Sequence, residues 1–132
     1  MRYLHTMIRV TNLDKSLRFY CEGLGFTQVS RQDYEKDRFT LVFLKALGDK
    51  NRLESERSPM IELTHNWDTS TYTLGNGYGH MAFQVESIEK VREGLKRIGS
   101  DLSWGPGLTP NGKTSMAFID DPDGYEIELL EY

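Results

Sequence analysis

The chain repeats one pattern in both of its halves. A strand that opens on a histidine is followed later by a strand in which a glutamate stands between isoleucine and leucine. These features are His5 with Ile61-Glu62-Leu63 in the first half, and His80 with Ile127-Glu128-Leu129 in the second. Repeated supersecondary units usually stack or pair to share a core. We therefore expect one domain over residues 1–132, built from module 1 at about 1–67 and module 2 at about 78–132.

Hydrophobic periodicity and turn residues predict the same order of elements in each half. In the first half, Asn12 or Asp14 is placed to cap a helix that glycines end at 23–25. The expected strands of that half are Leu4–Val10, Phe26–Arg31, Phe39–Leu44 and Met60–Thr64. In the second half we expect a helix over Ile88–Ile98 and strands at His80–Val85, Thr114–Ile119 and Tyr125–Glu131, with a weak strand near Asp101–Trp104.

Both halves thus read β-α-β-β-β, which predicts an α+β fold. The polar stretch Lys45–Pro59 is interpreted as a solvated loop, and the two modules are expected to join within Asp68–Gly79. A Gly- and Pro-rich stretch over Gly105–Gly112 is interpreted as a loop, and Asp120–Gly124 as a turn, because Pro122 presets it and Gly124 accepts positive φ.

Composition excludes several classes of function. A length of 132 residues suits one domain, and a net charge of −4 argues against a nucleic-acid surface, which is usually basic. No apolar run approaches the roughly 20 residues of a membrane span. The single cysteine, Cys21, excludes an internal disulfide and is interpreted as a buried small hydrophobe. We expect a cytoplasmic protein with neither a nucleic-acid nor a membrane partner.

The polar residues on the strands indicate chemistry. Alternate residues of a strand share a face, so His5 lies with Arg9, and Glu62 lies with Asn66. A glutamate set between apolar neighbours is costly to bury unpaired. Two histidines and two glutamates converging on one point would relieve that cost by binding a divalent metal. The competing interpretation, histidines that are only hydrogen-bonded and a solvated Glu62, is less consistent with the repetition.

Several assignments stay open on the residues alone. Glu126 shares a face with Glu128 and competes for the last ligand position, which the repeat assigns to Glu128. Arg9 either binds a substrate carboxylate or makes a surface salt bridge. Asn66 either contacts a ligand or ends its strand. His65 falls on the opposite face from Glu62 and is interpreted as a surface or interface histidine.

The chain resembles glyoxalase I (lactoylglutathione lyase), a family of the vicinal-oxygen-chelate superfamily. The resemblance covers almost the full length. The matching stretches are residues 4–10, Phe19-Tyr20 leading to Leu24-Gly25, residues 61–67, Tyr78-Gly79-His80 and residues 117–129. Together they are highly specific, whereas Asp-Pro-Asp-Gly at 121–124 alone would indicate only the superfamily.

The resemblance implies a function and a site. The metal would be bound by His5, Glu62, His80 and Glu128. The short chain favours nickel as this metal, with zinc or cobalt as alternatives. Glu128 would move the proton that converts the hemithioacetal of methylglyoxal and glutathione into S-lactoylglutathione. Arg9 and Asn66 would hold the γ-glutamyl end of the cosubstrate, glutathione. The family also implies a homodimer in which His5 and Glu62 of one subunit share a site with the other pair from its partner.

Alternatives to this assignment concern the thiol and the class of activity. A further family arginine that contacts glutathione corresponds to Asn76 here, so another low-molecular-weight thiol remains an alternative. Another metalloenzyme of the superfamily, such as an epimerase or a dioxygenase, is the nearer rival. A metal-free binding protein of the same fold is the more distant one, because the chain carries all four candidate ligands.

Overall fold

The structure is a computed structural model that describes residues 1–49 and 57–132. By its internal contacts the chain divides into two compact units. The first unit comprises Met1–Cys21 and Gly25–Tyr72, and the second comprises Glu22–Leu24 and Thr73–Tyr132. Part of the expected loop over Lys45–Pro59 lies outside the described residues. No helix among the described residues is long and apolar enough to span a membrane.

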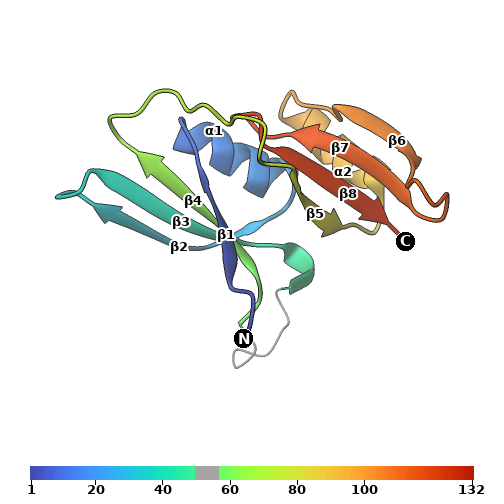
Figure 1. Cartoon of the computed structure of the whole chain (residues 1–132), viewed down its shortest axis with the longest axis horizontal. Coiled ribbons are helices and arrows are strands. Elements are labelled where there is room, and N and C mark those ends of the chain that lie inside the picture. Colours follow the sequence, from blue (N-terminus) through green and yellow to red (C-terminus); the bar gives the residue numbers. More distant parts are fainter. Residues whose placement is uncertain (50–56) are drawn as a thin grey trace. The chain divides into compact units, whose positions relative to one another are not determined.

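Each unit contains one four-stranded sheet (Figure 1). The first sheet has the order β1-β4-β3-β2, with β1 (His5–Arg9) parallel to β4 (Met60–Asn66). Its remaining strands, β3 (Phe39–Lys45) and β2 (Thr27–Tyr34), continue the sheet in antiparallel pairs. Burial alternates along β4 and β3, so that Ile61, Leu63, Val42 and Leu44 form the core face.

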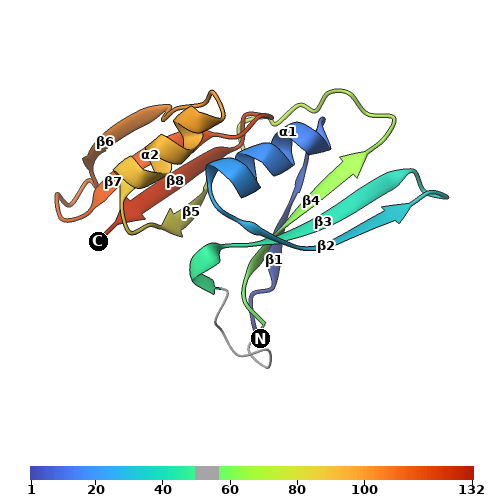
Figure 2. The same ribbon diagram turned by 180° about the vertical axis from the view of Figure 1, so that it is seen from behind.

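The second sheet repeats this arrangement with the order β5-β8-β7-β6. Here β5 (His80–Gln84) is parallel to β8 (Glu126–Glu131), and β7 (Ser115–Asp120) and β6 (Trp104–Leu108) follow in antiparallel pairs. The α-helix α2 (Ile88–Arg97) packs against this sheet at β8, as Figure 2 shows. Two β-α-β-β-β units, each with one mixed sheet, confirm the predicted α+β class.

The first helix differs from its prediction. α1 spans only Leu13–Leu17, and the chain continues as a π-helical turn over Arg18–Gly23. A π-helix has more residues per turn than an α-helix, so successive side chains diverge less. The adjacent rings of Phe19 and Tyr20 are both buried, in edge contact at 5.1 Å between centroids. Asn12, not Asp14, is the cap, because its side chain accepts from the Lys15 amide.

The predicted boundary before β6 is wrong. The strand begins at Trp104 and includes Gly105, Pro106 and Gly107, which the Gly- and Pro-rich pattern predicts as a loop. β6 is an edge strand with a register shift between Trp104 and Gly107, and both conditions tolerate proline. The Trp104 ring lies where a side chain at position 107 would be, so any larger residue there would displace this ring. Cys21 is half-buried, less covered than expected.

Gly94 allows α2 to approach the backbone of Gly23 closely inside the second unit. A Cβ at this buried position of α2 would lie 2.5 Å from the carbonyl oxygen of Gly23. We expect Gly94→Ala to destabilise the protein by about 1–3 kcal/mol, because this backbone clash outweighs the roughly 1 kcal/mol of helix propensity that alanine adds. Urea unfolding measures the change. Glu93→Ala, at the exposed neighbouring position, is the control, and equal stability of the two variants would contradict the close approach.

Candidate functional site

The first sheet brings His5 and Glu62 together. In the parallel pair β1–β4, Glu62 is opposite Met7, so His5 projects from the same face one alternation earlier. His5 Nε2 lies 2.9 Å from Glu62 Oε2, with 36% of the histidine side chain and 13% of the glutamate side chain exposed. The carboxylate is therefore largely shielded, while the imidazole remains open to a ligand.

The second sheet brings His80 and Glu128 together in the same register. In the parallel pair β5–β8, Glu128 is opposite Ala82, and Ala82 is two residues after His80. His80 Nε2 lies 3.3 Å from Glu128 Oε2, and 40% and 16% of the two side chains are exposed. The two halves thus build the same histidine–glutamate pair from the same strand pairing.

A phenylalanine completes each pair. Phe43 on β3 is opposite Glu62, and its ring meets the His5 ring edge-on at 5.4 Å between centroids. Phe118 on β7 is opposite Glu128, and its ring lies 5.6 Å from the His80 ring. Sequence analysis missed both phenylalanines. The available signal was that the strand preceding each glutamate strand carries a phenylalanine near its middle.

The second pair has a further carboxylate. Glu126 is directly opposite His80, and its Oε1 lies 3.9 Å from His80 Nδ1. The corresponding position of the first sheet, opposite His5, is Met60. Glu126 therefore lies on the expected face, but Glu128 is the residue that matches Glu62.

Tyr78 anchors the segment before His80, because its hydroxyl donates to the Glu126 carbonyl. Burial, with the nearby Asp121 charge, raises the pKa of Tyr78.

Arg9 and Asn66 are joined to each other at one end of the first sheet. Arg9 Nη1 donates to Asn66 Oδ1 at 2.7 Å, and the Tyr72 hydroxyl donates to the same oxygen at 2.9 Å. Asn66 is the last residue of β4, and Arg9 is the last of β1. Tyr72 was not expected from the sequence, since it lies in an irregular segment with no periodicity.

The donors of both pairs suit a divalent metal. Imidazole nitrogen and carboxylate oxygen bind such ions at about 2.1 Å, so two ligands at right angles have donor atoms about 3 Å apart. The pairs measure 2.9 and 3.3 Å. Over residues 1–49 and 57–132, no group of three or more His, Cys, Asp or Glu side chains could hold a metal within the chain as it stands. Each pair supplies one imidazole and one carboxylate.

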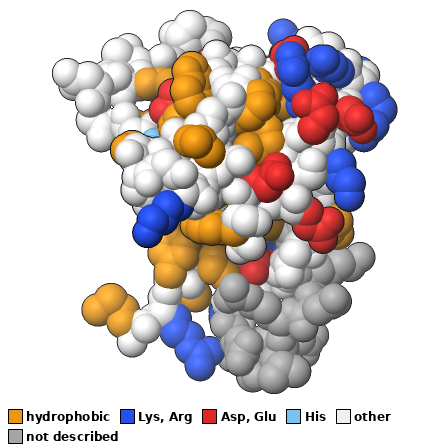
Figure 3. Space-filling view, turned by 90° about the vertical axis from the view of Figure 1, so that its right-hand side faces the viewer, with side chains coloured by type: hydrophobic (Ala, Val, Ile, Leu, Met, Phe, Trp, Pro, Cys, Tyr) orange, Lys and Arg blue, Asp and Glu red, His pale blue; other side chains and the backbone are white. Residues whose placement is uncertain are grey.

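Hydrophobic side chains reach the surface across the face drawn in Figure 3. Some of the exposed ones adjoin the pairs described above. Met7, opposite Glu62, is 41% exposed, and Trp104, opposite Phe118, is 50% exposed. Apolar groups beside shielded carboxylates are typical of sites for small organic molecules.

Comparison with known proteins places this arrangement in a family. The family model described as Glyoxalase/Bleomycin resistance protein/Dioxygenase superfamily matches residues 2–129. The chain belongs to this superfamily, as its sequence motifs indicated. Within it, the chain is 47% identical over 131 residues to a lactoylglutathione lyase of Neisseria meningitidis, covering 99% of this chain and 91% of the relative. A probable lactoylglutathione lyase of Synechocystis is also 47% identical, with 99% and 95% covered.

Solved structures agree with these relatives. The trypanothione-dependent glyoxalase I of Leishmania major superposes with a TM-score of 0.79 at 37% identity, covering 99% of this chain and 86% of that one. Glyoxalase I of Zea mays gives 0.88 at 32% identity. The match covers 99% of this chain but only 44% of the maize chain.

Proposed function

We propose that the protein is a lactoylglutathione lyase, which converts the hemithioacetal of methylglyoxal and glutathione into S-lactoylglutathione. The observation that carries the proposal is the pair of shielded histidine–glutamate contacts, built in the same register in both sheets. The names of relatives at 47% identity over nearly the full chain support it. The reaction moves one proton between neighbouring carbons and needs no nucleophile from the protein.

His5, Glu62, His80 and Glu128 would hold a divalent metal, for which we propose Ni²⁺, with Zn²⁺ or Co²⁺ as alternatives. When bound, such an ion stabilises negative charge that develops on the two oxygens of the substrate. Two nitrogen and two oxygen donors leave room for further ligands on a six-coordinate ion.

Glu128 is the residue to which we assign proton transfer. A carboxylate held beside the reacting carbon can remove its proton and return it to the neighbouring carbon. Glu128 is 16% exposed, and Phe118 lies opposite it on β7. This shielding limits exchange of the transferred proton with water. Arg9 and Asn66 would bind the γ-glutamyl end of glutathione, where the guanidinium supplies the charge that a carboxylate needs.

We also propose that the protein acts as a homodimer in the cytoplasm. Each sheet supplies two donors, so a partner subunit would complete each four-donor site. A two-fold dimer presents the same surface from both subunits and thereby forms two equivalent sites. The single cysteine fits a reducing compartment, in which disulfides do not persist.

The function is tested by following thioester formation in the ultraviolet from methylglyoxal and glutathione. Metal-stripped protein is reloaded with Ni²⁺, Zn²⁺ or Co²⁺ and compared with the stripped sample. We expect turnover only after reloading, with the highest rate for Ni²⁺. Turnover with none of these metals would contradict the function, and a higher rate with Zn²⁺ would contradict the metal assignment alone. Another thiol in place of glutathione tests the cosubstrate.

A further inference from the structure

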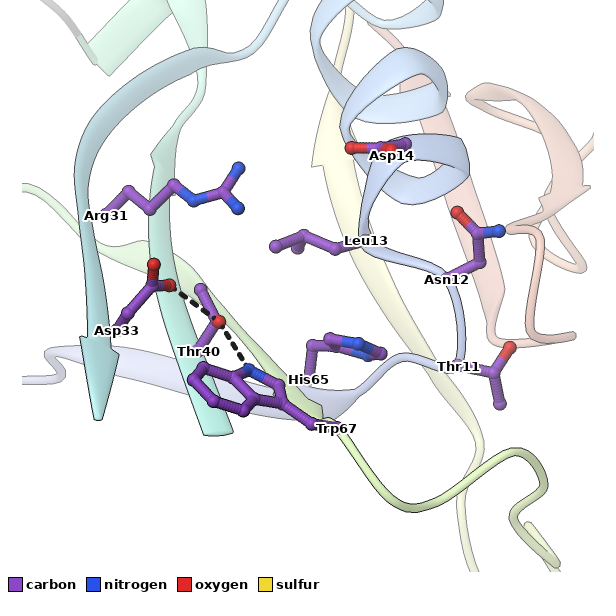
Figure 4. A pocket seen from close by; sticks show the side chains of 9 residues that line it. All are labelled: Thr11, Asn12, Leu13, Asp14, Arg31, Asp33, Thr40, His65 and Trp67. Atoms are coloured by element: carbon purple, nitrogen blue, oxygen red, sulfur yellow. Dashed lines mark hydrogen bonds between the residues drawn. The ribbon is translucent and has the colours of Figure 1, made fainter. Parts of the chain in front are cut away.

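The first unit contains a hollow of about 390 Å³ that none of the metal or substrate residues lines (Figure 4). Its walls come from the start of α1, from β2 and β3, and from the end of β4. They are Thr11, Asn12, Leu13, Asp14, Arg31, Asp33, Thr40, His65 and Trp67. His65 and Thr40 are paired across β4 and β3, three residues from the Glu62–Phe43 pair, and an odd separation places them on the opposite face of the sheet. The hollow therefore opens on the helix side of the sheet, opposite the His5–Glu62 pair.

A buried threonine fixes two walls of the hollow. Thr40 is 2% exposed, and its hydroxyl accepts from Trp67 Nε1 at 2.8 Å and donates to Asp33 Oδ1 at 2.7 Å. Because a hydroxyl has one proton, this arrangement holds Asp33 as an acceptor and leaves its second oxygen available. Trp67 is also held from outside the hollow by Arg38, whose guanidinium lies 5.6 Å from the ring centroid.

A cation stands beside this carboxylate. Arg31 precedes Asp33 by two residues on β2, so the two side chains share a face about 7 Å apart along the strand. Figure 4 shows the Arg31 guanidinium directed across the hollow toward α1. Within the described residues Arg31 has no hydrogen-bond or ion-pair partner, and it does not pair with Asp33. The hollow thus presents one positive group, Arg31, and two carboxylates, Asp33 on β2 and Asp14 on α1. Arg31 and Asp33 lie on the same face of β2 and are not paired, so a ligand can contact both.

The rest of the lining is less charged. His65 Nδ1 lies 3.1 Å from the Val10 carbonyl oxygen, which can only accept, so this nitrogen carries the proton and Nε2 remains available. The Leu13 side chain projects into the hollow, near His65 and Trp67 (Figure 4). Leu13 and the Trp67 ring therefore provide apolar surface beside Arg31 and Asp33.

We propose that this hollow binds a free α-amino acid with an apolar side chain. Its carboxylate would pair with Arg31, its ammonium group with Asp33, and its side chain would contact Leu13 and Trp67. A carboxylate and an ammonium group on one carbon are about 3 Å apart, so one molecule can contact Arg31 and Asp33 at once through hydrogen bonds of about 2.8 Å. The volume lies in the lower part of the range for small-molecule sites. The proposal does not depend on the lyase activity.

L-Leucine is the probe, and Trp67 is the reporter. In a Trp104→Phe background, Trp67 is the sole tryptophan of the chain. We expect L-leucine to change the Trp67 fluorescence and shift its indole N–H resonance, with a Kd of about 1 mM. 4-Methylpentanoate lacks the ammonium group, and isoamylamine lacks the carboxylate, so each should bind at least about tenfold more weakly. No binding of L-leucine, or equal binding of 4-methylpentanoate, would overturn the proposal.

Variants locate the binding. Arg31→Gln and Asp33→Asn should each weaken L-leucine binding at least about tenfold; the asparagine keeps an oxygen that can accept from Thr40. As a control, Arg97→Gln removes the same charge from an exposed position of the second unit. This variant should bind L-leucine as the unmodified protein does. Neither hollow variant should change turnover of methylglyoxal and glutathione. If Arg31→Gln binds L-leucine as tightly as the unmodified protein does, L-leucine binds elsewhere and the proposed site is refuted.

Discussion

Glu128→Gln is expected to lower kcat/KM for the methylglyoxal–glutathione adduct by about 10³-fold. Glutamine keeps an oxygen that can coordinate a metal but cannot accept the proton, so the variant loses general base catalysis, which contributes roughly 10²–10⁴-fold. Steady-state kinetics on reloaded protein measures the loss. Metal content, measured with the metal in excess, should stay close to that of the unmodified protein, which separates proton transfer from metal binding.

Glu126→Gln is the matched control for Glu128. The two glutamates share a strand and a face, and both approach His80, at 3.9 Å for Glu126 and 3.3 Å for Glu128. We expect Glu126→Gln to keep kcat/KM within about threefold, since its counterpart in the first sheet is the non-coordinating position of Met60. The reverse result, a large loss for Glu126→Gln and a small one for Glu128→Gln, would transfer the role to Glu126.

Glu62→Ala is expected to raise the dissociation constant for the metal by at least about 100-fold. This exceeds the 10–100-fold cost of removing a group that only supports a ligand. Competition with a chromophoric chelator measures it, and excess metal should restore part of the activity. Glu62→Gln, which keeps one oxygen, should weaken metal binding and activity less. Met60→Leu, two residues earlier on β4, is the control.

Metal binding by Glu62→Ala as tight as that of the unmodified protein would remove Glu62 from the site. If Met60→Leu and Glu62→Ala instead lose the metal together, the loss reflects damage to β4. Circular dichroism and urea unfolding of both variants, measured without metal, distinguish this outcome from loss of a ligand.

Much of the fold and the pairing within each half could be predicted from the sequence. In a strand, alternate side chains point to opposite faces, which separates His5 and Arg9 from the buried Ile8 and Val10. This alternation is local, so it can be read from the sequence of one strand. The repeated Ile-Glu-Leu run then indicates which glutamate accompanies each histidine. Both pairs lie on the predicted faces of parallel neighbours, as the β-α-β-β-β order requires.

What the sequence could not supply depends on registers and on tertiary contacts. Phe43 and Phe118 meet the histidines because of the pairing between strands, which no single strand specifies. β2 carries a register irregularity between Gln28 and Ser30, so the residues it presents to the helix side cannot be counted from its ends alone. The strand through Gly105–Gly107 likewise contradicts local propensity, since Trp104 packs over it.

In the proposed dimer, two histidine–glutamate pairs from different subunits form one site. Two inactive proteins test it most directly, one with His5→Ala and Glu62→Ala, the other with His80→Ala and Glu128→Ala. After unfolding and refolding as an equal mixture, half the dimers should be mixed, and each should regain one intact site of two. We predict that the mixture recovers roughly one quarter of the unmodified activity, while each protein alone remains inactive. A mixture as inactive as its components, with mixed dimers present, would contradict the account.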